Sequence, residues 1–320
     1  MKLSELNINA VTLKRKTPQV LWTIARFVLL LGISYVILYP LLVKFSLVFM
    51  DQIDLKDITV KWVPRHFTFK NVQTVVAVTD YWEILLRTVG FCALTAFLQV
   101  ATCTLAGCGF ARYKFKGRNF LFLLVIGTLV VPPQTYIVPL YRQFMNFDVF
   151  WIVSLFNGGK GINTIDSVWP FFIMAVTGMG IRSGLYIYIL RQAFRGLPKE
   201  LEEAASVDGA GGLRTFLQVL LPNVIPTVLV AFILAFVWQW NDTFYTSLFA
   251  PSLEVMAHMV SGIRTAISSY LGGWNETIGN MYTSMLINTS TLLSMLPVII
   301  LYVVCQKFFV QGVERSGLVG

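Results

Sequence analysis

Charged residues divide this sequence into long apolar stretches. No Asp, Glu, Lys or Arg falls within the five intervals 27–43, 88–111, 119–141, 215–241 and 277–306. A sixth interval, 167–190, is interrupted only by Arg182. An α-helix needs about 20 mostly apolar residues to cross the hydrocarbon core of a bilayer. Five intervals reach that length, the first because its apolar run continues past Lys44, and the sixth reaches it with Arg182 included. We therefore predict an all-α polytopic membrane protein with six transmembrane helices.

Lysine and arginine gather in the segments that this six-helix arrangement places on one side. Basic clusters occupy residues 2–26, 112–118, 191–214 and 307–315, whereas the basic residues of loop 51–82 are diluted by aspartates. Cytoplasmic loops of membrane proteins carry an excess of Lys and Arg. Both termini are therefore predicted to be cytoplasmic. The first apolar stretch is longer than the 7–15-residue core of a signal peptide, so it is expected to anchor the chain.

Composition supports the membrane assignment and excludes several classes of protein. The 320 residues are 56% hydrophobic and 13% charged, whereas soluble domains carry about 25% charged residues. An ordinary soluble enzyme, a secreted disulfide scaffold and a disordered chain are excluded. The net charge of +9 is explained by the basic cytoplasmic segments, so nucleic acid is not expected as a partner.

The sequence contains no recognisable catalytic or metal-binding motif. Gly159-Lys160 is followed by Gly161, and Ser154 stands where a P-loop would need its first glycine. The two histidines, His66 and His258, are far apart, and no His/Cys cluster has metal-ligand spacing. The chain is therefore expected to bind no cofactor and to catalyse no reaction, so that any work it does draws on energy supplied elsewhere.

One cytoplasmic segment, at about residues 195–222, has the features of a docking helix. Pro198 suits a helix start and Gly209 a helix end, and the first turns carry acidic residues that a helix dipole favours. A small-residue face is predicted to enter a groove on another protein, with a knob and an acidic flank. The residues of this face are Leu201, Glu203, Ala204, Ala205, Asp208 and Gly209. The alternative is an ordinary surface helix that joins two spans.

The same segment resembles the EAA loop of ABC importer permeases. Glu203-Ala204-Ala205, three residues, Gly209, nine residues and Val219-x-Leu221-Pro222 follow the pattern E-A-A-x3-G-x9-I-x-L-P, with Val219 for Ile. Other stretches over about residues 68–320 are similar to the sugar-importer branch, specifically its maltose-type second permease subunit. They are Leu105–Arg118, Val131-Pro132, Val138–Leu140, Leu190–Phe194, Trp240–Asp242 and Gln306–Gly312.

The resemblance implies a type I ABC importer permease fold and a set of partners. These are a second, related permease subunit that forms a heterodimer with this chain, two ATPase subunits, and an external solute-binding protein. ATP and Mg would be bound by the ATPase subunits, each of which accepts one EAA helix. Leu221 and Pro222 would begin the fifth span. The expected location is the inner or plasma membrane of a prokaryote, and the expected cargo is a sugar or oligosaccharide.

Three residues are candidates for the solute path. Trp240 and Asn241 combine an aromatic ring with an amide, as sugar sites do, or else belong to an interfacial belt with a capping Asn. Arg182 is an intramembrane arginine, for which a functional role is the default hypothesis. It binds an anionic group of the cargo or pairs with an acid of the partner subunit. Pro132 and Pro133 are expected to kink or break the third span.

The chain is predicted to divide into an N-terminal region with the first span at 1–50, an external loop at 51–82 and a permease core at 83–320. Two rival functions remain open. One is an ABC permease for a solute other than a sugar. The other is a secondary transporter, which usually shows internal repeats and membrane-embedded acids; the predicted spans contain no Asp or Glu.

Overall fold

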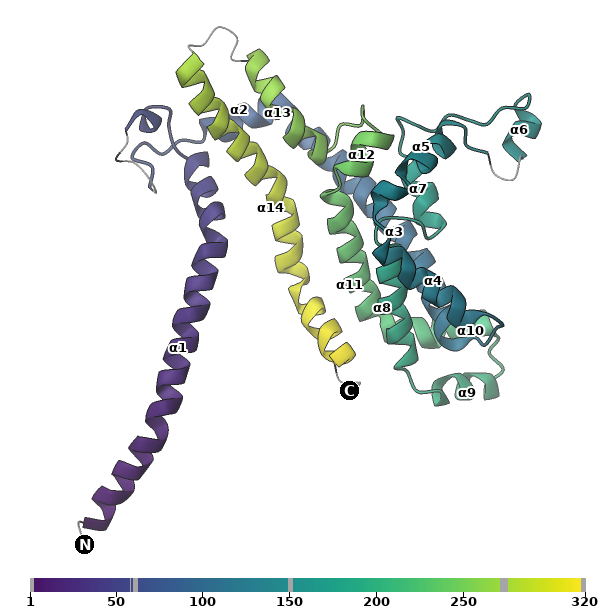
Figure 1. Ribbon diagram of the computed structural model, residues 1–320, viewed down its shortest axis with the longest axis horizontal. Helices are drawn as coiled ribbons and strands as arrows, with labels where there is room; N and C mark the ends of the chain where they lie inside the picture. Colours follow the sequence, from purple (N-terminus) through teal and green to yellow (C-terminus); the bar gives the residue numbers. More distant parts are fainter. Residues whose placement is uncertain (1–2, 58, 60–62, 149–151, 271–275, 318–320) are drawn as a thin grey trace. The chain divides into compact units, whose positions relative to one another are not determined.

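The computed structural model describes residues 3–57, 59, 63–148, 152–270 and 276–317, and these form α-helices joined by short links (Figure 1). In chain order the elements are α1 (Leu3–Val48), η1 (Asp54–Lys56), α2 (Lys70–Thr79), α3 (Tyr81–Arg112), α4 (Arg118–Val130), η2 (Pro133–Thr135), α5 (Ile137–Met145), α6 (Ile152–Phe156), α7 (Trp169–Val176), α8 (Ser183–Arg195), α9 (Glu200–Val207), α10 (Gly212–Thr215), η3 (Phe216–Leu220), α11 (Leu221–Trp240), α12 (Phe244–Phe249), α13 (Met256–Tyr270) and α14 (Glu276–Gly317). Within the described ranges the only strand-like pairings are two isolated bridges, which confirms the all-α prediction.

Four helices are long and apolar enough to cross a membrane among the described residues. They cover Leu21–Val48, Tyr81–Arg112, Gly212–Trp240 and Met281–Gln306. The other two charge-poor intervals each fold as two shorter helices with a break between them. In the first of these, α4 is separated from α5 by Pro132 and Pro133, which lack the N–H that a continuing helix would need.

The second break separates α7 from α8. Gly178 at φ +73° and Arg182 at φ +61° both adopt left-handed backbone conformations there. A run of right-handed residues cannot pass through two such positions, so the helix stops at Val176 and restarts at Ser183. The apolar pattern alone indicates uniform spans, because it does not register the backbone conformations that break these two intervals.

The described chain separates into two compact units. Unit 1 comprises Met1–Val75 and Ile267–Leu293. The loop after α1 is organised by Asp54, which is buried and accepts hydrogen bonds from the backbone N–H groups of Arg65 and His66. Its carboxylate lies 2.6 Å from the His66 ring. Burial opposes ionisation of Asp54, but these donors outweigh it and hold the pKa of the carboxyl below its usual value.

Unit 2 comprises Val76–Ala266 and Ser294–Gly320, and α3 is its central helix. This helix packs against α7, α8 and α11. Its buried face carries Phe91, Cys92, Ala96, Val100 and Cys103. Three of the four cysteines, Cys92, Cys103 and Cys108, are buried and free, so they serve as small packing residues.

Gly107 sets the closest approach between α3 and α8. A Cβ at this position would lie 2.9 Å from the Leu190 Cβ and 3.0 Å from the Arg191 backbone nitrogen. Small residues at helix contacts let two backbones approach closely inside a membrane. The absence of a side chain at Gly107 is therefore a requirement of this contact.

We predict that Gly107→Ala destabilises the protein by about 1–3 kcal/mol, because the α8 backbone must move away. Gly109→Ala is the matched control, since it lies on the same helix with nothing within 4 Å of an added Cβ. The melting temperature of the purified protein is expected to fall for Gly107→Ala and to hold or rise for Gly109→Ala. Equal shifts in the two variants would refute the contact.

Candidate functional site

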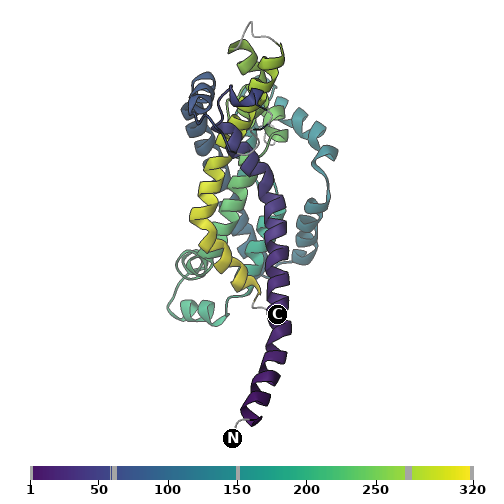
Figure 2. The same ribbon diagram turned by 90° about the vertical axis from the view of Figure 1, so that its left-hand side faces the viewer.

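The segment between α8 and α11 projects from one end of unit 2 and carries helix α9 (Figures 1 and 2). This helix spans Glu200–Val207 and has three acidic residues in its first turn. The positive end of the helix dipole favours carboxylates at those positions. The structure thus forms the short acidic helix that the sequence predicts, starting two residues after Pro198.

A Schellman motif ends α9 at Gly209. The Ala210 N–H donates to the Ala205 carbonyl at 2.9 Å, and the Gly209 N–H donates to the Ser206 carbonyl at 3.1 Å. This motif requires a left-handed backbone at the residue just past the helix end, and Gly209 has φ +74° there. No atom lies within 4 Å of a Cβ built there. The glycine is therefore required by backbone conformation and not by crowding.

The two sides of α9 differ in exposure. Glu203, Ala204 and Asp208 are exposed, and Val207 is 88% exposed. Ala205 is buried and Leu201 is partly buried, so they face this chain's own packing. Residues 203, 204, 207 and 208 are spaced as neighbours on one helical surface. We name these four residues the α9 face; it combines a small residue, an apolar side chain and two carboxylates.

A hydrophobic cluster supports α9 from beneath. Its buried members are Cys108 of α3, Phe194 of α8, Phe216 and Leu220 of η3, and Val224 of α11. Leu197, in the link that leads to α9, packs against this cluster. The ends of three long helices therefore meet where the α9 segment begins and returns.

Arg112 connects α9 to the core of unit 2. It lies in the last turn of α3, and its side chain is 8% exposed. Its Nη2 donates to the Leu197 carbonyl at 2.7 Å, and its Nε lies 3.0 Å from Glu202 Oε1. The guanidinium thus holds the link that leaves α8 through a hydrogen bond, and it contacts the acidic turn of α9 as an ion pair whose two atoms are not aligned for a hydrogen bond. A charge removed from water in this way is stabilised by its partners.

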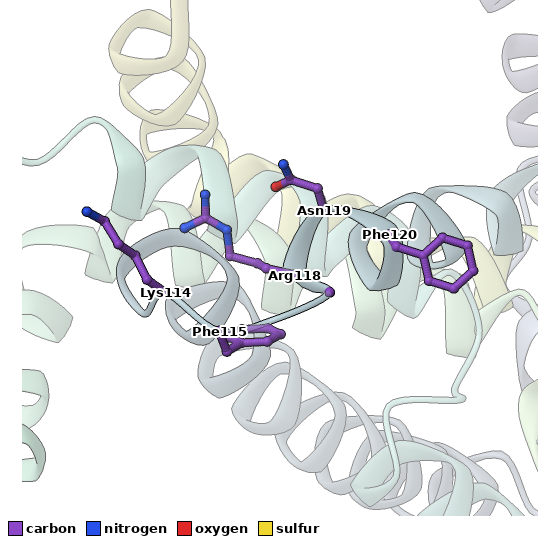
Figure 3. A pocket seen from close by; sticks show the side chains of 6 residues that line it. Lys114, Phe115, Arg118, Asn119 and Phe120 are labelled. Atoms are coloured by element: carbon purple, nitrogen blue, oxygen red, sulfur yellow. The ribbon is translucent and has the colours of Figure 1, made fainter.

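The link between α3 and α4 forms a basic surface pocket of about 280 Å³ (Figure 3). The polar ends of Lys114, Arg118 and Asn119 lie on the same side of the link, whereas the Phe120 ring points away. Gly117, at φ +83°, makes the turn that starts α4. This basic cluster and the α9 segment both adjoin Arg112, so two of the basic segments identified in the sequence lie at the same end of unit 2.

Leu221 and Pro222 lie in the first turn of α11, but the helical run begins earlier, at Gly212. Between them, Phe216–Leu220 forms a π-helical turn. Pro222 has no N–H to donate to the preceding turn, and a π-turn is a common way to accommodate such a defect. Helix α10, the π-turn and α11 therefore form one continuous element behind α9.

The solute-path candidates occupy different environments. Trp240 is 3% exposed, and its indole N–H donates to the Ser294 carbonyl at 3.2 Å. Asn241 is exposed and donates to the Val237 carbonyl of its own helix. Arg182 lies in the α7–α8 break with its guanidinium 4.5 Å from the centre of the Trp238 ring. Of the candidates, Arg182 presents an exposed charge beside the exposed Trp238 ring. Trp240 is buried and packs within this chain.

Sequence reasoning overlooked Arg112, Val207 and Trp238. Arg112 stands among four basic residues of a short link, and only its contacts distinguish it from its neighbours. Val207 lies four positions after Glu203, so helical spacing was a usable signal for its place on the α9 face. Trp238 is two positions from Trp240, on a different side of α11.

We predict that Arg112→Gln loosens α9, because it removes a charge from the Leu197 carbonyl and from Glu202. A hydrogen bond that involves a charged group contributes about 2 kcal/mol, so amide hydrogen exchange over residues 200–207 is expected to accelerate about 30-fold. Arg118→Gln is the control, since the Arg118 guanidinium donates to the nearby Tyr113 carbonyl, at 3.3 Å, and makes no ion pair within the described part of the chain. Unchanged exchange in Arg112→Gln would show that α9 is held by other contacts.

Comparisons with known proteins agree with the helical architecture. The chain is 27% identical to the maltodextrin transport system permease protein MdxG of Bacillus subtilis over 310 residues, which are 95% of this chain and 99% of that protein. It is 26% identical to the melibiose/raffinose/stachyose import permease protein MelC of the same species, over 82% of this chain and 86% of that one. It is 27% identical to the osmoprotective compounds uptake permease protein GgtD of Synechocystis, over 80% and 77%.

A solved structure shares the fold. A chain of a bacterial ABC transporter involved in the import of the acidic polysaccharide alginate superposes with a TM-score of 0.70 at 19% identity, covering 90% of this chain and 96% of its own length. This confirms the type I ABC importer permease fold. The family described as "binding-protein-dependent transport system inner membrane component" matches residues 103–315, which include α9, Gly209 and most of unit 2. The chain belongs to this family of membrane transport components.

Proposed function

We propose that this chain is the permease subunit of an ABC importer for a sugar or oligosaccharide. It forms half of the translocation path and takes up the energy of ATP hydrolysis through α9. Family membership and the maltodextrin and melibiose permeases among its relatives support the assignment. They also favour an importer over a secondary transporter.

The observation that carries the proposal is the exposed α9 face on a rigid support. Glu203, Ala204, Val207 and Asp208 are exposed on a helix whose other side is held by Arg112 and the cluster around Phe216. A face with an apolar centre and acidic edges fits a groove with a basic rim. The support transmits a displacement of α9 to α3, α8 and α11. Subunit rotation about such a contact is a known means of opening a transport path.

The partners follow from this role. A second, related permease subunit completes the path as a heterodimer, two ATPase subunits bind ATP and Mg and accept the coupling helices, and a solute-binding protein delivers cargo from outside. The chain is proposed to lie in the inner or plasma membrane of a prokaryote, with six spans and both termini in the cytoplasm. The broken helices α4–α5 and α7–α8 supply the third and fourth spans, since irregular backbone at membrane depth is tolerated where protein or a cavity surrounds it.

The coupling contact is assigned to Leu201, Glu203, Ala204, Ala205, Asp208 and Gly209, with Leu221 and Pro222 at the start of α11. In this assignment Ala205 and Leu201 pack α9 against its own chain, whereas the α9 face contacts the ATPase. The solute path is assigned to the surface around Arg182 and Asn241, with Trp240 behind it as a packing residue.

A second candidate cargo is a compatible solute smaller than an oligosaccharide. The uptake permease for osmoprotective compounds from Synechocystis is as similar in identity as the sugar permeases are. The α9 contact is the same for both cargoes, so the choice between them concerns the solute path alone.

The Gly209→Val variant tests the coupling role. Valine at φ +74° is strained by about 1–2 kcal/mol, so the end of α9 must reorganise while the core of unit 2 is untouched. The complex is expected to assemble and to hydrolyse ATP, but oligosaccharide uptake into proteoliposomes that contain the full complex and its binding protein should fall at least tenfold. Gly211→Val is the control, because Gly211 has an extended backbone at φ −70° and open space around it.

Normal uptake by Gly209→Val would contradict the coupling role of α9. Equal loss in Gly209→Val and Gly211→Val would attribute the defect to the loop in general. Failure of the wild-type complex to couple uptake of any saccharide to ATP hydrolysis would refute the proposed cargo class.

A further inference from the structure

Arg87 and Arg182 of unit 2 differ in how their charges are compensated. Arg87 of α3 contacts Glu83 and Glu254, each at 2.6 Å. Arg182 makes no ion pair with any residue that the structure describes; its guanidinium lies over the Trp238 ring, at 4.5 Å. An uncompensated guanidinium at membrane depth is costly and is retained where it meets a charge from outside the chain.

The backbone at Arg182 is also strained. Its φ of +61° is left-handed, a conformation that costs a non-glycine residue of order 1–2 kcal/mol. The Arg182 carbonyl accepts a hydrogen bond from the Leu185 N–H at 2.9 Å, as expected at the start of a helix. Arg182 therefore keeps its left-handed backbone while it is bonded to the first turn of α8. This backbone conformation fixes the direction in which the side chain leaves the α7–α8 break.

The Trp238 ring is in contact with this guanidinium, and tyrosine hydroxyls lie within range of its charge. Trp238 is 42% exposed, and Tyr136 is also exposed at the surface. The Tyr136 and Tyr245 hydroxyls hydrogen-bond to each other at 2.9 Å. The positive charge of Arg182 acts on the Tyr186 and Tyr245 hydroxyls, and the buried Tyr186 hydroxyl has no hydrogen-bond partner among the described residues.

Asp242, the acid of the same stretch of chain, is already engaged. Asp242, which also acts electrostatically on Tyr245, accepts the Tyr245 and Thr246 backbone N–H groups and the Thr246 hydroxyl. These bonds cap the first turn of α12. Its oxygens are therefore directed into its own chain, and they leave the Arg182 guanidinium without a carboxylate within 4 Å among the described residues.

We propose that Arg182, Trp238, Tyr136 and Tyr245 form a binding site for a saccharide that carries a carboxylate, as in a uronic acid unit. The inference rests on the proposed function and narrows its cargo class. The guanidinium lies over the Trp238 ring and makes no ion pair with a described residue, so its N–H groups are available to a carboxylate. The exposed Tyr136 ring offers a surface for the apolar face of a sugar, and the paired tyrosine hydroxyls offer donors and acceptors to sugar hydroxyls.

The test measures saccharide binding to the full importer complex in lipid nanodiscs by calorimetry. The probes are tetrasaccharides of gluco, galacto and manno configuration, each as a matched pair with and without a carboxylate at C6. The variants are Arg182→Gln and, as control, Arg142→Gln, which removes an exposed arginine of α5 that lies outside the cluster. Co-purification of the second permease subunit is measured for each variant.

For at least one pair, the wild-type complex and Arg142→Gln are expected to bind the carboxylated form about tenfold or more tightly than the neutral form. Arg182→Gln should abolish this preference and leave the neutral affinity within about twofold. A wild type with no preference, or a preference that survives in Arg182→Gln, overturns the proposal. Loss of the second permease subunit from Arg182→Gln also overturns it, because Arg182 would then pair with an acid of that subunit.

The outcomes separate this inference from the proposed function. If neutral saccharides drive ATP-dependent uptake but no pair shows a preference for the carboxylate, the importer assignment stands and only the acidic cargo class fails. If no saccharide of either kind is taken up, the proposed function itself fails.

Discussion

The contact of Arg112 with the α9 segment is the interaction on which the proposed function depends. Helix α9 has eight residues, and isolated helices of that length are marginal in water. It needs a connection to the core that resists a lateral force. Arg112 provides this at the point where α3 ends, through the Leu197 carbonyl and Glu202. In the proposed coupling role, a displacement of α9 would reach the central helix of unit 2 through this contact.

Unit 2 combines close helix–helix contacts with two breaks, one between α4 and α5 and one between α7 and α8. Gly107 lets α3 and α8 approach until an added Cβ would meet backbone, so these two helices move together. Pro132 and Pro133 interrupt one predicted span, and Gly178 and Arg182 interrupt another. Irregular backbone inside a membrane is tolerated where it borders protein or a cavity. In the proposed importer, the two breaks would face the second permease subunit and the solute, whereas α3, α8 and α11 pack together as the core of unit 2.

Much of the fold and of the coupling segment could be predicted because local rules determine them. The charge-free intervals correspond to the apolar helices, and the Gly209 position follows from the need for a left-handed residue after α9. The start at Gly212 of the helical run that continues into α11 was missed, because a π-turn leaves no composition signal. The division of α9 into an inner and an outer side, with Ala205 inward and Val207 outward, depends on tertiary packing. Arg112 and Trp238 gain their roles from residues distant in sequence, and one sequence does not reveal such pairs.

The most direct test of the coupling role places a photo-cross-linking amino acid at position 207, the exposed apolar centre of the α9 face. Irradiation of the assembled importer in membranes should join this position to an ATPase subunit, with a yield that changes when ATP is bound. The same amino acid in place of Ile152, which is exposed in α6, should give no such product. Absence of a cross-link from position 207 to the ATPase, in a complex that still transports, would contradict the account.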